Sequence, residues 1–249
     1  ANTHLALLYF TMCSYWGDLP FKMQASNSMD DMYISRTSQT EILKKLEELL
    51  VEAIPVLEEK KNNCFVDANS LFFVSKDVAR VILANVYVLQ KNYDKAEEQL
   101  NKVISNGYYS IANSQTISYL NNSECIIGGI YATRTVSEGE NIIPILDYKE
   151  VLLTAAECYY HLGKSSKAKA ISDELCTKKS LSISGTNELE RIAKIRYEIQ
   201  SPYYLPFIRR NSLGSSMLGL SSSQLYQLLW PIPMNELALN PSMTQNPGY

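Results

Sequence analysis

The chain has 249 residues, 46% of them hydrophobic, so it is long enough to bury a full core as a folded globular protein. Charged residues make up 20% and the formal net charge is -3, which excludes a single-sign field for nucleic acid or an anionic membrane surface. The longest apolar run, Leu5 to Phe10, is far shorter than the roughly 20 residues that cross a bilayer.

Two amphipathic helices are predicted at the start of the chain. In residues 3–16 apolar side chains recur at spacings of three and four, and the segment Gly17 to Pro20 ends the pattern. Thr37 or Ser38 is expected to cap a second helix, whose apolar face follows the same period up to Ala53. Each helix should therefore pack one face against a core.

The clearest unit is a helical hairpin over residues 75–107, and a similar hairpin returns at residues 148–178. In the first, an inward-facing apolar helix is followed by the turn Lys91 to Asp94 and a second helix from Lys95. The two hairpins align at a constant offset, which pairs Ala84 with Ala156, Tyr87 with Tyr159 and Ala96 with Ala168. Such recurrence is typical of tetratricopeptide repeats, whose unit is about 34 residues.

The remaining segments interrupt the helical period. Residues 108–147 are rich in Ser, Asn, Thr and Gly, with β-prone pieces such as Ile126–Ile127, and are predicted as a long irregular insertion. A helix resumes over residues 187–200, and Pro202 and Pro206 are expected to leave 201–228 irregular. The proline-rich residues 229–249 predict an extended or turned tail that packs over the helices. Helix should exceed strand by at least about threefold.

The sequence contains no recognisable catalytic or metal-binding constellation. It lacks Gly-rich phosphate-binding motifs and Gly-x-Ser-x-Gly, and its two histidines, His4 and His161, have no second ligand or acid at helical spacing. The five cysteines are widely spaced without a Cys-x-x-Cys pair, so neither a disulfide framework nor a zinc site is indicated. We expect a binding protein rather than an enzyme, with no cofactor and no metal ion.

Tyrosine rings in the irregular segments are the best candidates for ligand contacts. A tyrosine face stacks on a sugar ring while its hydroxyl forms hydrogen bonds, and a ring outside the helical period is not committed to packing. Tyr108 and Tyr109 share this setting, whereas Trp16 and Trp230 adjoin Gly or Pro and are interpreted as structural. The predicted ligand-binding residues, including polar partners, are Tyr119, Tyr131, Tyr203, Tyr204, Asn121, Asn122 and Arg134.

Four stretches of the chain resemble, in the same order, the SusD/RagB family. The most specific is the tail, with Leu229-Trp230-Pro231-Ile232-Pro233, Asn235-Glu236-Leu237, Asn240-Pro241 and Gln245-Asn246-Pro247-Gly248-Tyr249. The others are Tyr15-Trp16-Gly17-Asp18-Leu19-Pro20, Ala79 to Tyr87 leading to Tyr93-Asp94-Lys95-Ala96, and Tyr148-Lys149-Glu150-Val151-Leu152-Leu153 leading to Ala155-Ala156-Glu157. Together they cover nearly all of the chain.

This resemblance implies an all-α dominated fold in which 1–249 is one SusD-like helical domain. Its parts are tetratricopeptide-like helices in 1–107 and 148–178, irregular insertions at 108–147 and 201–228, and a closing tail at 229–249. Family members are typically about twice as long, so the chain resembles their larger C-terminal part. The resemblance also implies a lipid anchor at the outer-membrane surface and capture of glycans or peptides for a TonB-dependent, SusC-like β-barrel transporter.

Two alternative functions remain open. A cytoplasmic tetratricopeptide-type protein–protein interaction scaffold would explain the hairpins and free cysteines, but not the proline-rich tail. A hydrolase would need a pair of carboxylates, whose separation is spatial and cannot be read from sequence. Glu188 with Glu190 and Asp30 with Asp31 are interpreted as a helix start and a loop.

Overall fold

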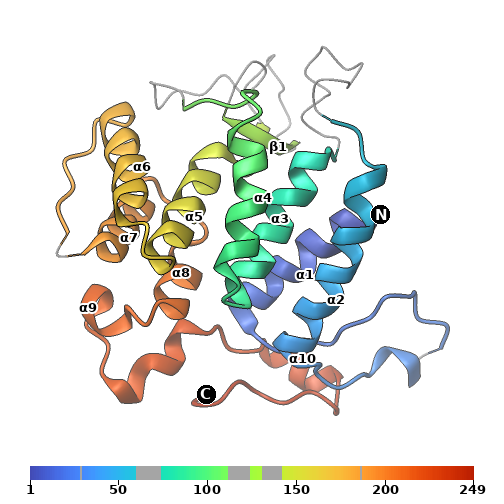
Figure 1. The fold of residues 1–249 in the computed structure, drawn as a ribbon. Helices are drawn as coiled ribbons and strands as arrows, with labels where there is room; N and C mark the ends of the chain where they lie inside the picture. Colours follow the sequence, from blue (N-terminus) through green and yellow to red (C-terminus); the bar gives the residue numbers. More distant parts are fainter. Residues whose placement is uncertain (29, 60–73, 112–123, 131–141, 186) are drawn as a thin grey trace, which may run out of the picture.

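The structure is a computed structural model that describes residues 1–28, 30–59, 74–111, 124–130, 142–185 and 187–249. Helices dominate it, as predicted. The α-helices are α1 (Asn2–Trp16), α2 (Gln39–Ala53), α3 (Lys76–Leu89), α4 (Tyr93–Ile104), α5 (Tyr148–His161), α6 (Ser165–Lys178), α7 (Glu188–Glu198), α8 (Tyr204–Arg210), α9 (Gly214–Leu218) and α10 (Met234–Leu239). Helices α1 to α5 pack in sequence order, α6 and α7 lie against α5, and the chain then continues through α8 and α9 to α10 (Figure 1).

The first two helices form as predicted. α1 ends at Gly17, which has a positive φ of 76° and donates its N–H to the carbonyl of Cys13. Ser38 is the N-cap of α2, and its hydroxyl accepts a hydrogen bond from the N–H of Glu41. The apolar face of α2 is fully buried at Leu46. Two short 3₁₀ helices, η1 (Asp30–Met32) and η2 (Ile54–Val56), precede and follow α2.

The two predicted helical hairpins are α3 with α4 and α5 with α6, and they turn in the same way. Two residues after the end of α3, Lys91 has a positive φ, and the next N–H, that of Asn92, donates to the carbonyl of Tyr87. In the second hairpin Gly163 takes the place of Lys91, and Lys164 bonds back to Tyr159 in the same register. α4 starts at Tyr93 rather than at Lys95, because Asn92 is already its N-cap.

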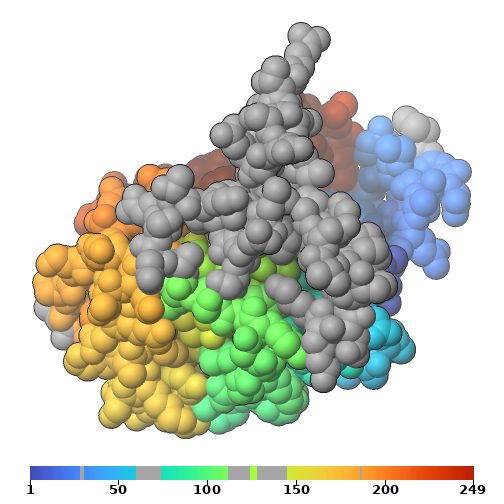
Figure 2. Space-filling view, turned by 90° about the horizontal axis from the view of Figure 1, so that it is seen from above, coloured from blue at the N-terminus to red at the C-terminus, as the bar shows by residue number. Residues whose placement is uncertain are grey.

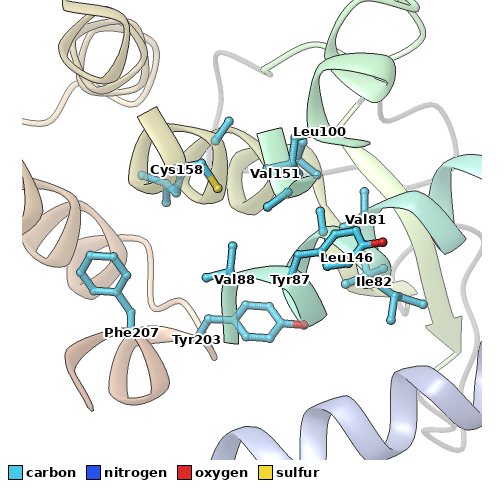
Figure 3. Packing of buried hydrophobic residues seen from close by; sticks show 14 of the residues in the cluster. Val81, Ile82, Tyr87, Val88, Leu100, Leu146, Val151, Cys158, Tyr203 and Phe207 are labelled. Carbon is cyan, nitrogen blue, oxygen red and sulfur yellow. The ribbon is translucent and has the colours of Figure 1, made fainter. Parts of the chain in front are cut away.

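Close helix packing explains the recurring alanines. Ala84 and Ala156 on the inner helices, and Ala96 and Ala168 on the outer helices, have no exposed surface. Seen from above, the green surface of α4 lies beside the yellow to orange surface of α5 and α6 (Figure 2). Buried apolar side chains from α3, α4, α5 and α8 belong to one cluster that spans the molecule, and Figure 3 shows part of it.

A two-stranded antiparallel sheet, β1 (Cys125–Ile130) with β2 (Ile142–Asp147), precedes α5. The β-prone pair Ile126–Ile127 lies in β1 and is buried, as its composition suggests. Asp147, the last residue of β2, is also the N-cap of α5, so the strand leads directly into the helix. The rest of the predicted insertion, 112–123 and 131–141, lies outside the described residues.

The prediction that residues 201–228 are irregular is wrong. They form α8, α9 and a 3₁₀ helix, η6 (Ser222–Leu228). Pro206 is the third residue of α8, where a backbone N–H has no intrahelical acceptor to lose. Gly214 opens α9, and a Cβ there would lie 2.7 Å from a methyl of Leu225 and 2.9 Å from one of Leu228. Proline and glycine therefore mark a helix start and a close contact here, not a loop.

The tail packs onto α1, as predicted, although it contains the short helix α10. The N–H of Trp230 donates to the carbonyl of Tyr15 at 2.8 Å. Asn246 is 2% exposed, and its amide nitrogen donates to the carbonyls of Trp16 and Trp230 at 3.0 and 2.6 Å. One buried side chain thus joins the end of α1 to two separate parts of the tail.

Asn246→Ala is expected to lower the melting temperature by about 2–12 °C. The substitution removes the amide that donates to the carbonyls of Trp16 and Trp230, at a cost of about 1–3 kcal/mol. Each kcal/mol lowers the melting temperature by about 2–4 °C at this chain length. Thermal denaturation followed by circular dichroism measures this. Asn235→Ala, at an exposed position of α10, is the matched control and should leave the midpoint unchanged. Equal melting temperatures for both variants would contradict the joining role of Asn246.

Candidate functional site

A cleft of about 620 Å³ lies where α7, α8, α9 and the loop between α6 and α7 meet. This volume falls within the range of about 300–1,000 Å³ that is usual for small-molecule sites. α7 contributes Lys194, Tyr197 and Glu198 to its lining, α8 contributes Tyr204, and α9 contributes Met217. The cleft thus combines aromatic, apolar and charged side chains from elements that are separate in sequence.

Tyr197 and Tyr204 form an aromatic corner in this cleft. Their ring centroids are 5.6 Å apart and their planes meet at 59°. The side chain of Tyr197 is 64% exposed, whereas Tyr204 is half-buried, and burial together with the neighbouring Tyr197 raises the pKa of Tyr204. Within the described residues, neither hydroxyl has a hydrogen-bond partner. The pair offers one ring face, one angled ring and two available hydroxyls.

The two charged side chains of the cleft differ in their engagement. The ammonium group of Lys194 donates to the carbonyl of Ser184 at 2.7 Å. The carboxylate of Glu198, which is exposed, has neither a cation nor a hydrogen-bond donor beside it in the part of the chain that the structure describes. Ser182 also lines the cleft, and its hydroxyl is likewise unengaged within those residues. The available polar groups are therefore hydroxyls and one carboxylate.

The loop wall of the cleft is fastened at several points. Arg191 of α7 pairs with Asp173 of α6 at 2.6 Å, and Lys194 binds the Ser184 carbonyl. Gly185 packs so closely that a Cβ there would lie 2.9 Å from the backbone nitrogen of Arg191. Because Lys194 of α7 holds the loop at Ser184 and Arg191 ties α7 to α6, little of this wall has to be ordered on binding, which lowers the entropic cost of binding.

Two buried ion pairs lie where α5, α7 and α8 meet, and one of them holds α8, which carries Tyr204, against α5. Arg210 donates from two nitrogens to the carboxylate of Glu157 at 2.6 and 2.5 Å. Arg196 of α7 contacts Glu150 of α5 at 2.5 Å. The ring of Phe207, labelled in Figure 3, lies 5.0 Å from the guanidinium group of Arg196 and 5.3 Å from that of Arg210. These contacts fix the position of α8 beside the cleft.

The structure brings one of the seven predicted ligand residues into the cleft, Tyr204. Tyr203 is 9% exposed and lies in the core near Phe10, where burial and the charge of Glu150 raise its pKa. Its ring therefore supports the fold and has no open face for a ligand. The other five predicted residues lie outside the described residues: Tyr119, Tyr131, Asn121, Asn122 and Arg134.

The other rings considered from sequence contact other parts of the protein, although Trp230 is 41% exposed. Trp16 and Trp230 meet edge to face at 5.1 Å where the tail contacts α1, in keeping with a structural role. Tyr109 is buried, and its hydroxyl donates to Asp77 at 3.2 Å. Tyr108 is partly buried against the core. None of these rings lines the cleft.

The described residues contain neither a candidate metal-binding cluster nor a helix that could span a membrane. Within them, no group of three or more His, Cys, Asp or Glu side chains could hold a metal ion. His161 is stacked on Tyr93 at 4.2 Å and bonded to Asn211 at 2.7 Å. The described helices are each too short or too polar to span a lipid bilayer.

Sequence reasoning missed Tyr197 and Glu198. Both belong to the helix predicted over 187–200, so they were treated as ordinary helical positions. A usable signal existed, because a large ring at Tyr197 falls outside the buried face of α7, which consists of Leu189, Ile192, Ala193, Ile195 and Arg196. An aromatic residue on the polar face of an amphipathic helix is a candidate contact residue.

The fold of this protein matches solved structures, whereas its sequence matches no known family. The sequence matches no family profile and no curated protein. Solved structures do match, and a SusD superfamily protein from Bacteroides vulgatus superposes with a TM-score of 0.73 at 16% identity, covering 98% of this chain and 76% of that one. A SusD-like carbohydrate-binding protein from Bacteroides fragilis gives 0.70 at 13%, over 98% and 78%.

A third solved structure, a laminarin-binding SusD-like protein, gives a TM-score of 0.73 at 17% identity and covers all of this chain and 77% of its own. The protein therefore has the SusD-like fold, built on tetratricopeptide-type helical hairpins. At these identities the likeness establishes the fold alone. The chain accounts for about three quarters of each matched structure, a larger share than the half implied by the sequence resemblance.

Proposed function

We propose that this protein captures glycans at the cell surface and passes them, unmodified, to a TonB-dependent, SusC-like outer-membrane transporter. The SusD-like fold supports the proposal, since two proteins that share it are described as carbohydrate-binding and laminarin-binding. The observation that carries the proposal is the aromatic corner of Tyr197 and Tyr204, with its two unengaged hydroxyls in an open cleft.

The chemistry of the cleft suits binding rather than turnover. Glycoside hydrolysis needs two carboxyl groups that face one scissile bond, about 5–9 Å apart. Among its lining residues the cleft has a single carboxylate, Glu198. A ring face supplies contact with sugar C–H groups, while hydroxyls and a carboxylate supply hydrogen bonds. Tyr119, Tyr131, Asn121, Asn122 and Arg134 stay proposed as further ligand contacts.

Location and partner follow from the same proposal. A lipid anchor at the outer membrane would hold the protein next to its transporter, so that captured glycan is released beside the transport channel. Co-purification with a SusC-like transporter from the native membrane would support this part. Recovery of the protein in the cytosolic fraction, without any membrane partner, would count against it and favour a scaffold.

Tyr197→Ala should weaken glycan binding by about tenfold and leave the melting temperature unchanged. A stacked ring contributes about 0.5–1.5 kcal/mol beyond the area it buries, and about 1.4 kcal/mol corresponds to a factor of ten in affinity. Titration calorimetry with neutral oligosaccharides measures the change. Tyr33→Ala is the matched control, because Tyr33 is 39% exposed and lies in the loop between α1 and α2. Unchanged affinity in Tyr197→Ala, or equal losses in both variants, would place the site elsewhere.

One observation favours the alternative of a protein–protein interaction scaffold. A groove of about 310 Å³ lies between α4 and α6 over α5, with apolar side chains such as Leu152 and Ile171 in its lining. Lys167 stands over the ring of Tyr159 in the same groove, 5.3 Å from its centre. Between hairpins of the tetratricopeptide type, such a groove could accept a peptide. A peptide-library screen in parallel with the glycan titrations separates the two functions.

A further inference from the structure

We infer that the cleft selects neutral glycans over uronates and other anionic glycans, with Glu198 as the residue that sets this selectivity. The inference rests on the proposed glycan-binding function and names the ligand class of the same cleft. It comes from the charge and hydrogen-bonding state of the side chains around Tyr197 and Tyr204.

Two cationic side chains of α7, Lys194 and Arg191, lie in or near the cleft. Lys194 is the one cationic side chain that lines the cleft, and its ammonium group donates to the carbonyl of Ser184 at 2.7 Å. Arg191, three residues earlier on α7, pairs with Asp173 at 2.6 Å and lies 3.9 Å from Glu188. Arg191 is therefore already paired with carboxylates, and Lys194, which keeps its charge and two further N–H donors, is the one cation of the cleft that an anionic sugar can reach.

Glu198 is the one acidic residue among those that line the cleft. The carboxylate of Glu198 lines the cleft without a cation or donor among the described residues. A ligand carboxylate or sulfate about 4 Å away would be repelled, by roughly fivefold in affinity when fully solvated and by more when water is displaced. Salt screens this repulsion only in part, because the distance is shorter than the Debye length of about 8 Å.

A neutral sugar gains hydrogen bonds and apolar contacts from the side chains of the cleft. A carboxylate accepts two hydrogen bonds at once, and charge-assisted bonds are about twice as strong as neutral ones. Adjacent hydroxyls of a pyranose ring match that pair of oxygens. The hydroxyls of Tyr197, Tyr204 and Ser182 add donors and acceptors, and the half-exposed apolar surface of Leu218 on α9 meets the C–H face of the sugar. Every unengaged group in the cleft thus fits a polyhydroxylated, uncharged ligand.

The experiment compares neutral and anionic probes of equal length. Titration calorimetry at low salt would use maltohexaose, cellohexaose, laminarihexaose, mannohexaose and xylohexaose against hexagalacturonate and hexamannuronate. The wild-type protein should bind at least one neutral hexasaccharide about tenfold or more tightly than either uronate. Glu198→Gln should weaken that neutral binding by about threefold to tenfold and reduce the neutral-to-uronate ratio to less than about threefold.

Matched controls separate selectivity from general effects. Glu236→Gln makes the same chemical change at an exposed position of α10 and should alter neither affinity nor ratio. Because Glu198 is exposed and unpaired, its substitution should leave the melting temperature at the wild-type value. If the wild type binds uronates as tightly as neutral glycans, or Glu198→Gln leaves the ratio unchanged, the inference is overturned while glycan binding stands. If the wild type binds none of the seven probes, the proposed function itself fails.

Discussion

We expect Glu157→Ala to lower the free energy of unfolding by about 3–5 kcal/mol, because it leaves the Arg210 guanidinium as an uncompensated buried charge. Glu157 has no exposed surface, and two nitrogens of Arg210 and the amide of Asn211 all donate to its carboxylate. Urea denaturation measures the loss. Glu98→Ala is the control: the side chain of Glu98 is 63% exposed in its pair with Lys102, so the change should be less than about 1 kcal/mol.

The pH dependence of the same substitution provides a second readout. Burial raises the pKa of Glu157, but Arg210 more than offsets this and holds it below the ordinary value of 4.5. The stabilisation from Glu157 is therefore complete above pH 4.5 and is lost as the pH falls toward its lower folded pKa. The stability difference between wild type and Glu157→Gln should be constant at neutral pH and shrink below pH 4.5.

The neighbouring pair behaves in the opposite sense. Burial raises the pKa of Glu150, and the charge of Arg196 offsets this only in part. Its contribution is thus lost as the pH rises above 4.5, so raw stability curves mix the two carboxyls. Subtracting the Glu157→Gln curve removes most of the Glu150 effect, which is common to both proteins. A difference that stays constant from pH 7 to pH 3 would contradict the assigned role of Glu157.

Phe207→Ala should lower the free energy of unfolding by about 3–5 kcal/mol, from the cavity left by a fully buried ring. Part of the loss comes from the attraction between this ring and the guanidinium groups of Arg196 and Arg210. Denaturant titration measures it, with Tyr197→Ala as the exposed aromatic control. Because α8 carries both Phe207 and Tyr204, the variant should also weaken glycan binding. Full stability in Phe207→Ala would mean that the ion pair between Arg210 and Glu157 holds α8 without the help of this ring.

The helices could be predicted because their apolar residues recur at spacings of three and four, and these are the residues that the structure buries. Thr37 or Ser38 was expected as the cap of α2, and Ser38 is that cap; the offset between the hairpins reappears in the matching turns at Lys91 and Gly163. Pro206 misled the prediction for α8, because a proline in the first turn of a helix has the same sequence signature as one that breaks a helix. Its position in the helix could be recognised only once the start of α8 was known.

The cleft was only partly predictable, since it is assembled from elements that meet in space. Tyr204 was found because it follows a proline outside the helical period. Tyr203, next to it, was chosen for the same reason, yet the short helix α8 turns the two rings in different directions, one into the core and one into the cleft. Tyr197 and Glu198 line a cleft only because the loop at Ser184 and α9 lie beside them in space. No local sequence pattern links those segments.

The contact between the tail and α1 also constrains how the protein folds. The carbonyl of Trp16, at the end of α1, accepts hydrogen bonds from Arg36 and from Asn246, so part of its bonding comes from residues far along the chain. Contacts of such long sequence separation carry a loop-closure cost and slow folding relative to purely local helical bundles. The hydrogen bonds between α1 and the tail can therefore form only after the intervening helices have been synthesised, whereas the packing of α1 against α2 and α3 does not depend on them.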